Sequence, residues 1–175
     1  MRKSGVDAPQ TPLYPTFAPM FQRSRYLTLL QPLRTGGQDP AVVEALSVLD
    51  TALRTSPQVV HEVCALARNL NWRPNLVAAA AVARARLSTG VVVRELWAAI
   101  DRPSWVSPQL AVATSIVDPR FADGARARIG RATGKTLTAL AALAEISMPP
   151  VADPDNGAEV AAAWRRAMLV QYAAT

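Results

Sequence analysis

The sequence predicts an all-α protein, and three observations favour this fold class. Beyond residue 39, apolar residues recur at intervals of three and four, which is the spacing of one helix face. Half of the 175 residues are hydrophobic but only 6% are aromatic, so the core must form from small side chains on closely approaching helices. Proline, aspartate and glycine interrupt the apolar stretches at short intervals. We therefore expect an array of about eight short helices.

Start signals mark the beginnings of several expected helices. At four places an Asp or Ser that can cap a first turn precedes a proline, which fits the first turn because its missing N–H would have no partner there. These dipeptides are Asp39-Pro40, Ser56-Pro57, Ser107-Pro108 and Asp118-Pro119. In chain order, the expected helices span residues 40–54, 57–70, 74–89, 91–100, 108–117, 119–130, 134–147 and 158–173.

Each expected helix carries one apolar stripe. The connections between them are short, except for a loop over residues 149–157, where four prolines and glycines end any helix. The stripes begin, in order, with Val42 and Leu46, Val59 and Val63, Leu76 and Ala80, Val92 and Leu96, Leu110 and Ala113, Phe121 and Ala125, Leu137 and Leu140, and Val160 and Trp164. The stripe of the second helix ends at Leu70. Stripes of this width indicate helices that bury one face against neighbours.

Residues 1–38 form a segment distinct from the helical domain of residues 39–175. Prolines are dense enough there to prevent a continuous helix. Aromatic and aliphatic residues such as Tyr14, Phe17 and Leu29 are nevertheless frequent. We expect an extended arm that packs on the helical body, with a short helix near residues 22–30. A partly disordered tail is the alternative.

One phrase occurs twice, as Asn71-Trp72-Arg73-Pro74-Asn75-Leu76 and as Ser104-Trp105-Val106-Ser107-Pro108-Gln109-Leu110. Its two tryptophans are 33 residues apart, which is the length of one helix pair. The phrase resembles the turn between the helices of HEAT-like repeats, over residues 57–147. The resemblance implies helix hairpins stacked as an α-solenoid. A third copy near Gly134 lacks both Trp and Pro and arrives early, so regular stacking is expected to fail there.

The resemblance also implies a class of function. Small HEAT-like proteins are similar to bacterial immunity proteins, which neutralise toxins. We therefore expect a non-enzymatic protein-binding module that occludes a cognate toxin. The alternative is a HEAT-like protein that binds nucleic acid, since some members of that family are DNA glycosylases. A structural subunit of a larger assembly is a third possibility.

Arginine supplies nearly all of the formal net charge of +6. A GC-rich genome would produce the same composition, but stacked repeats can also align arginines into a row. Such a row would bind carboxylates of an acidic protein partner, or less favourably the phosphates of nucleic acid. The candidate partner-binding residues are Arg68, Arg73, Arg84, Arg86, Arg94, Arg102, Arg120 and Arg126.

No catalytic, cofactor-binding or metal-binding residues are predicted. His61 and Cys64 are three apart on one helix face, but Cys64 belongs to an apolar stripe, which favours core packing. The stretch Gly130–Thr136 imitates a phosphate-binding loop but is one residue short and follows no strand. A helix connection is the favoured interpretation.

The expected compartment is the cytoplasm. No apolar run approaches the roughly 20 residues of a membrane span. The basic start, Met1-Arg2-Lys3, is followed by prolines and not by the apolar stretch of a secretory signal. The four tryptophans are expected to wedge between helices, with an exposed stacking platform as the alternative for one of them.

Overall fold

The structure is a computed structural model that describes residues 13–30 and 39–172. Within these ranges it contains helices and no strand, so the predicted all-α class is confirmed. The α-helices are α1 (Pro40–Thr55), α2 (Val59–Arg68), α3 (Trp72–Ala85), α4 (Gly90–Ile100), α5 (Ser107–Val117), α6 (Phe121–Ile129), α7 (Gly134–Leu143) and α8 (Gly157–Arg166). Two 3₁₀-helices, η1 (Pro15–Met20) and η2 (Gln22–Leu29), precede them, and a π-helical turn, η3 (Ala167–Gln171), extends α8.

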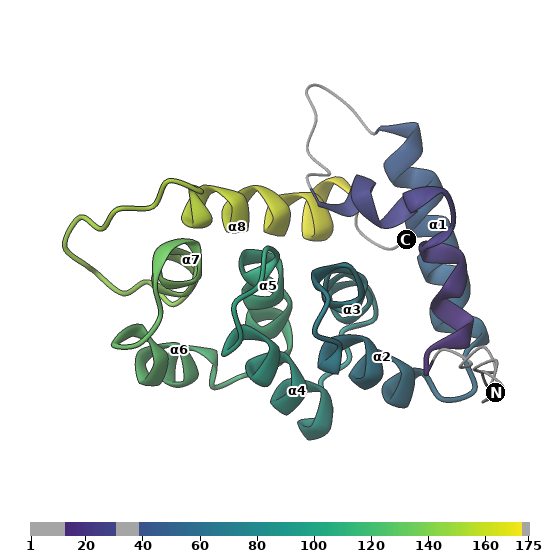
Figure 1. Ribbon diagram of the computed structural model, residues 1–175, viewed down its shortest axis with the longest axis horizontal. Coiled ribbons are helices and arrows are strands. Elements are labelled where there is room, and N and C mark those ends of the chain that lie inside the picture. The colour runs from purple at the N-terminus through teal and green to yellow at the C-terminus, as the bar shows by residue number, and fades with distance from the viewer. Residues whose placement is uncertain (1–12, 31–38, 173–175) are drawn as a thin grey trace, which may run out of the picture.

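Three consecutive helix pairs form the body of the molecule. Figure 1 shows α2, α4 and α6 in one row, and α3, α5 and α7 in a second row above it. Each helix of the first row packs on its successor in the second, and α5 packs on both α3 and α7. Helix α8 lies across α5 and α7. These packing pairs are those of a helical array.

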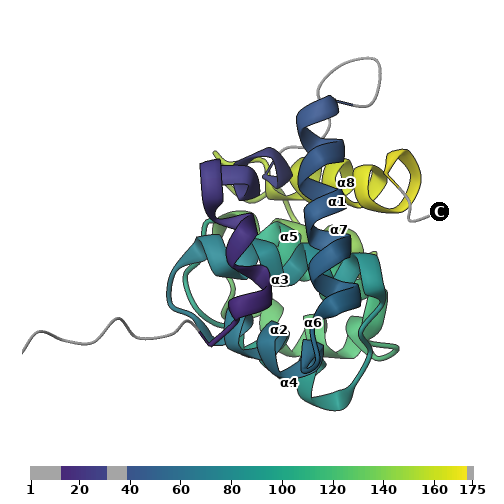
Figure 2. The same cartoon turned by 90° about the vertical axis from the view of Figure 1, so that its right-hand side faces the viewer.

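Helix α1 and the N-terminal segment close one end of the array. Figure 2 shows α1 beside η1 and η2, and both short helices pack on it. Phe17, Met20, Tyr26 and Leu29 are buried there. The buried carboxylate of Glu62 accepts hydrogen bonds from the backbone N–H of Thr16 (3.0 Å) and from its hydroxyl (2.7 Å). The rest of the predicted arm, residues 1–12 and 31–38, lies outside the described residues.

The four predicted start signals differ in what they do in the structure. Asp39 caps α1, because its Oδ1 accepts a hydrogen bond from the N–H of Ala41 at 2.8 Å. Ser56 and Asp118 accept from the N–H two residues on but form a turn before the helix, so α2 and α6 begin two residues later than predicted. Ser107 does not cap α5. It is the first residue of the helix, and its buried hydroxyl accepts from Thr136 at 2.7 Å.

Helix α3 is the centre of the core. Every residue from Pro74 to Ala83 is buried, because α3 packs against α1, α2, α5 and η2 at once. Four consecutive alanines, residues 78–81, have no exposed surface. Side chains this small let the neighbouring helices approach closely on all sides. The alanine-rich composition of α3 therefore allows the close helix packing at the centre of the core.

Two predictions concern the third pair. Regular stacking is expected to fail near Gly134, and the structure shows such a failure in one row only: α7 packs on α5 as α5 packs on α3, whereas α6 does not pack on α4 as closely as α4 packs on α2. Helices α6 and α7 have only 9 and 10 residues, which accommodates the short repeat spacing. Helix α7 was also expected to continue to residue 147. It ends at Leu143, because Glu145 takes a left-handed conformation (φ 55°) that turns the chain away.

Candidate functional site

The connections inside the three helix pairs lie side by side along one edge of the array, which we call the turn edge. They are residues 69–71, 101–106 and 130–133. Two depressions lie between them. The tryptophan groove separates the first two connections and is lined by Leu70, Asn71, Trp72, Arg73, Pro103, Ser104 and Trp105. The arginine pocket separates the last two, and Pro103 lines both depressions.

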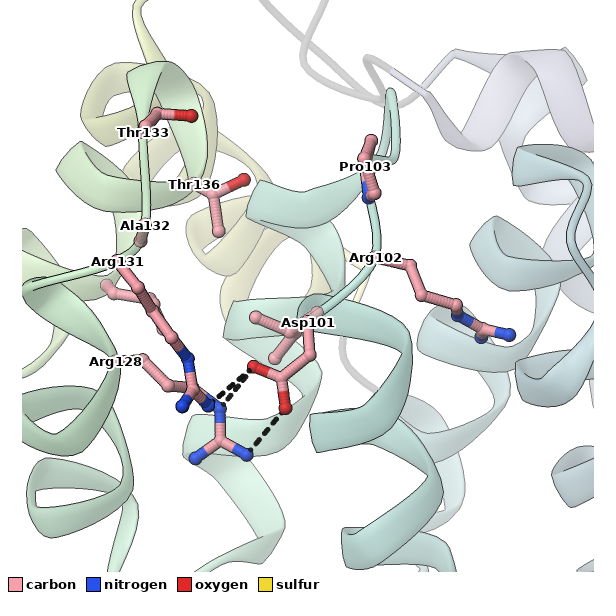
Figure 3. A pocket seen from close by; sticks show the side chains of 10 residues that line it. Asp101, Arg102, Pro103, Arg128, Arg131, Ala132, Thr133 and Thr136 are labelled. Atoms are coloured by element: carbon pink, nitrogen blue, oxygen red, sulfur yellow. Dashed lines mark hydrogen bonds and ion pairs between the residues drawn. The ribbon is translucent and has the colours of Figure 1, made fainter.

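The arginine pocket is organised around Asp101, which follows α4. Figure 3 shows Arg128 and Arg131 converging on its carboxylate from α6 and the residues after it. Arg128 makes two hydrogen bonds to Asp101, of 2.8 and 2.9 Å, and Arg131 makes one of 3.2 Å. Arg128 also lies over the ring of Trp97, 4.2 Å from its centroid. These bonds join the second helix pair to the third.

Two further arginines join the first pair to the second. Arg102 donates to the carbonyl oxygens of Ala67 (2.6 Å) and Arg68 (2.8 Å). Carbonyls in the last turn of a helix have no partner within it, and a cation there also suits the helix dipole. Arg68 in turn donates to Glu95 of α4 at 2.7 Å. Arginine therefore holds both junctions of the array together.

The ion pairs lower the pKa values of both carboxylates. The hydrogen bond from Arg68, reinforced by the charges of Arg68 and Arg94, lowers the pKa of Glu95 in spite of its partial burial. Burial is the largest influence on Asp101 and acts to raise its pKa, but the bonds and charges of Arg128 and Arg131 together outweigh it. The pKa of Asp101 is therefore also lowered, and both groups favour the ionised form.

The lowered pKa values of Glu95 and Asp101 predict that the folded protein loses stability in acid. A lowered pKa in the folded state stabilises the fold above the ordinary values, 4.5 for Glu95 and 3.8 for Asp101, and this contribution is lost as the pH falls through the lowered values. We expect the free energy of unfolding, measured by urea titration, to decrease from neutral pH to about pH 3. The decrease should be smaller in the double variant Glu95→Gln/Asp101→Asn. Identical pH dependence in the variant and the natural chain would contradict this assignment.

The two repeated tryptophans occupy corresponding turns but different surroundings. Asn71 and Ser104, each just before its tryptophan, both accept a hydrogen bond from the N–H two residues on. The ring of Trp72 is half-buried and packs edge-on against Tyr26, with 5.8 Å between centroids. Trp105 remains 74% exposed. The exposed platform considered for one tryptophan is therefore present at Trp105.

The structure does not bring the eight predicted arginines together. Arg68, Arg73 and Arg102 lie on the turn edge. Arg86 and Arg120 lie at the opposite edge, in the connections α3–α4 and α5–α6. Arg94 and Arg126 are exposed on α4 and α6, with side chains 70% and 62% accessible. Arg84 is buried against α1, where it pairs with Asp50.

Sequence reasoning missed three contributors to the turn edge. Leu70 was assigned to the apolar stripe of a helix, but α2 ends at Arg68, so Leu70 projects into solvent and is 88% exposed. Arg131 and Lys135 belong to the stretch that imitates a phosphate-binding loop. That stretch is the α6–α7 connection, as favoured, with Gly134 in a left-handed conformation (φ 49°). The basic residues of this connection were the sequence signal that could have identified it as part of the turn edge.

The remaining chemical candidate is a buried thiol. Cys64 is 3% exposed, as core packing predicts, whereas His61 is exposed. Burial is the main reason that the pKa of Cys64 is raised, and it outweighs the opposing charge of Arg68. Within residues 13–30 and 39–172, no group of three or more His, Cys, Asp or Glu is placed to hold a metal ion. None of the helices described there is long and apolar enough to span a membrane.

Comparison of the chain with protein-family models, with curated proteins and with solved structures finds no match. The turn edge is therefore defined by its own geometry and chemistry.

Proposed function

We propose that this protein is a non-enzymatic binding module that docks a protein partner on the turn edge. One observation carries the proposal: Leu70 and Trp105 have the highest exposed fractions, 88% and 74%, of the large apolar side chains in the described residues, and they line the same groove. An exposed apolar cluster on a polar surface is typical of an interaction site. Tryptophan and arginine, which both occur here, are also the residues most often found at interface hot spots.

Within this class, we propose a HEAT-like stack of three helix pairs that acts as a bacterial immunity protein. The repeated turns at Trp72 and Trp105 support the HEAT-like assignment. A rigid edge of this kind would occlude a toxin by covering its surface, and arginines at its border would pair with toxin carboxylates. We propose that the protein acts in the cytoplasm.

Nucleic acid is the second candidate, and the arginine contacts weigh against it. Arg84, Arg102 and Arg128 are bound to carboxylates and carbonyls of the protein itself. Two carboxylates, Glu95 and Asp101, lie at the junctions between the helix pairs and offset part of the charge. A phosphate-binding face would need these arginines free to contact several phosphates.

The test of the proposed function is assembly with the product of the adjacent reading frame. We expect the purified full chain to bind that product and to abolish its toxicity on co-expression. The double variant Leu70→Ser/Trp105→Ser should weaken binding, measured by calorimetry, by about 30-fold or more, the loss typical of a hot spot. Val43→Ser, which changes an exposed residue of α1, is the matched control and should bind normally. Equal affinity of the double variant would exclude the turn edge as the docking site.

A further inference from the structure

We infer that the tryptophan groove receives an extended acidic segment of the partner, with one large apolar side chain seated between Leu70 and Trp105. This inference rests on the proposed function and names the chemistry of its ligand. The groove has a volume of about 480 Å³, within the roughly 300–1,000 Å³ that ligand sites occupy. It is open to solvent along the turn edge, as an extended chain requires.

The apolar walls of the groove favour an apolar anchor. Leu70 and Trp105 come from neighbouring helix pairs and face the same depression, with Pro103 beside them. Neither side chain contributes much to the core, since both are largely exposed. A leucine or phenylalanine placed between them would remove apolar surface on both sides from water. The gain in free energy would come from that burial.

The walls are held in place before the partner arrives. The ammonium group of Lys135 lies 4.7 Å from the ring centroid of Trp105 and is itself paired with Asp155 at 3.4 Å. On the other side, Tyr26 packs against Trp72. Hydrogen bonds within the turns fix Asn71 and Ser104. A preformed groove costs less conformational entropy on binding than a flexible one.

The charges around the groove favour an acidic segment. Arg73 lies over Trp72, 5.4 Å from the ring centroid, so each tryptophan of the groove has a cation against it. Arg73 lines the groove and no carboxylate does. The nearby carboxylates are each paired with a cation: Glu95 with Arg68, Asp101 with Arg128 and Arg131, and Asp155 with Lys135. Arg73 therefore supplies the positive charge that the groove presents to a ligand, which favours aspartate and glutamate beside the anchor.

A single-stranded nucleic acid could instead stack a base on Trp105. The contacts around the groove favour the peptide. Lys135 already lies against the Trp105 ring, and the aliphatic wall at Leu70 offers neither a stacking surface nor a phosphate contact. An acidic peptide with an apolar anchor uses both walls and the charge of Arg73. The experiment below distinguishes the two ligands.

The experiment is a titration of the ¹⁵N-labelled full chain with a synthetic peptide of Asp and Glu around one central Phe. The signal is the indole N–H resonance of Trp105, identified by its absence in Trp105→Phe. We expect a saturable shift of this resonance and none at Trp97 or Trp164, whose indoles are bonded to Asp118 and to the Leu29 carbonyl. Leu70→Ser should weaken binding by about 10-fold, and Arg73→Gln by a smaller factor that diminishes with added salt.

Three comparisons decide the outcome. A peptide with Ala in place of Phe, and one with Lys in place of the acids, should bind at least about 10-fold more weakly, and Val43→Ser should bind normally. Equal binding of either control peptide, or no shift at millimolar peptide, would overturn the inference. Tighter binding of an oligothymidine would also overturn it, in favour of nucleic acid.

The result is separable from the proposed function. The acidic peptide could fail to bind while the full-length partner still binds Leu70→Ser/Trp105→Ser more weakly than the natural chain. That result would support docking on the turn edge and overturn only the inference of an acidic segment. If the peptide binds at Trp105 but the full-length partner binds the double variant normally, the ligand chemistry is supported and the proposed docking of that partner is excluded.

Discussion

Replacing Gly157 with alanine should destabilise the protein strongly. Gly157 is the first residue of α8 and lies directly on the backbone of α7. A Cβ added there would be 2.6 Å from the carbonyl carbon of Lys135, and closer still to its Cα and oxygen. Backbone atoms cannot rotate away as a flexible side chain can, so the two helices would have to separate. The N–H of Gly157 also donates to Asp153 at 2.6 Å, a bond that the separation would strain.

We expect the free energy of unfolding to fall by about 3 kcal/mol or more, at the upper end of overpacking effects. Chemical denaturation measures it. Gly130→Ala is the matched control, because a Cβ at Gly130 meets nothing within 4 Å and its φ of −67° suits alanine. That change should leave stability unchanged or raise it by about 0.4–1 kcal/mol. A Gly157→Ala protein as stable as Gly130→Ala would show that α7 and α8 are not packed this closely.

The same contact matters for the tryptophan groove. Lys135, whose backbone lies under Gly157, is the residue whose ammonium group lies over Trp105. Displacing α8 would therefore also shift one wall of the groove. The packing of α8 on α7 thus links the stability of the array to the geometry of its candidate site.

Local signals were sufficient to predict most of the helices. The cap at Asp39 and the apolar stripes are properties of neighbouring residues, and they place α1, α4 and α5 within one or two residues of the observed bounds. Helix ends set by backbone conformation were harder to predict. The residues around Glu145 do not indicate a left-handed conformation, so the predicted end of α7 is four residues too late.

The candidate site depends on long-range contacts and was only partly predictable. The two repeated phrases differ little in sequence, yet Trp72 is half-buried and Trp105 exposed. The difference arises because Tyr26, from the N-terminal segment, packs against Trp72. Trp105 meets the ammonium group of Lys135 instead. No spacing within the repeat could reveal which neighbour each tryptophan would have.

The contacts of the arginines also depend on the fold and could not be predicted from the sequence. The sequence predicted a row of arginines available to a partner, whereas Arg84 and Arg102, both among the eight candidates, are bound to groups of the protein itself. A guanidinium group is well suited to both tasks, because it forms several hydrogen bonds in fixed directions. Which task it performs depends on whether a carboxylate or a helix end faces it in the fold.

Arg84 provides the clearest test of this distinction. Its side chain, 8% exposed, donates to the carbonyl of Tyr172 and makes two hydrogen bonds to Asp50 of α1, one of them from Nε at 2.9 Å. Asp50 is itself 25% exposed. Arg84→Leu would keep the apolar stem but leave the Asp50 carboxylate without its guanidinium. Removing one partner of a buried ion pair typically costs about 3–5 kcal/mol, and the partial exposure of Asp50 places this case near 3 kcal/mol.

Urea denaturation of a double-mutant cycle with Asp50→Asn would isolate the pair. We expect the double variant to be more stable than the sum of the two single losses predicts, because the second change removes the unpaired charge left by the first. Arg94→Ala, at an arginine 70% exposed, should change stability by no more than about 0.5 kcal/mol. Arg84→Leu should still bind the partner while folded, since Arg84 lies near the end of α3 remote from the turn edge. If it instead weakened partner binding without loss of stability, Arg84 would belong to the docking surface and would not be a structural arginine.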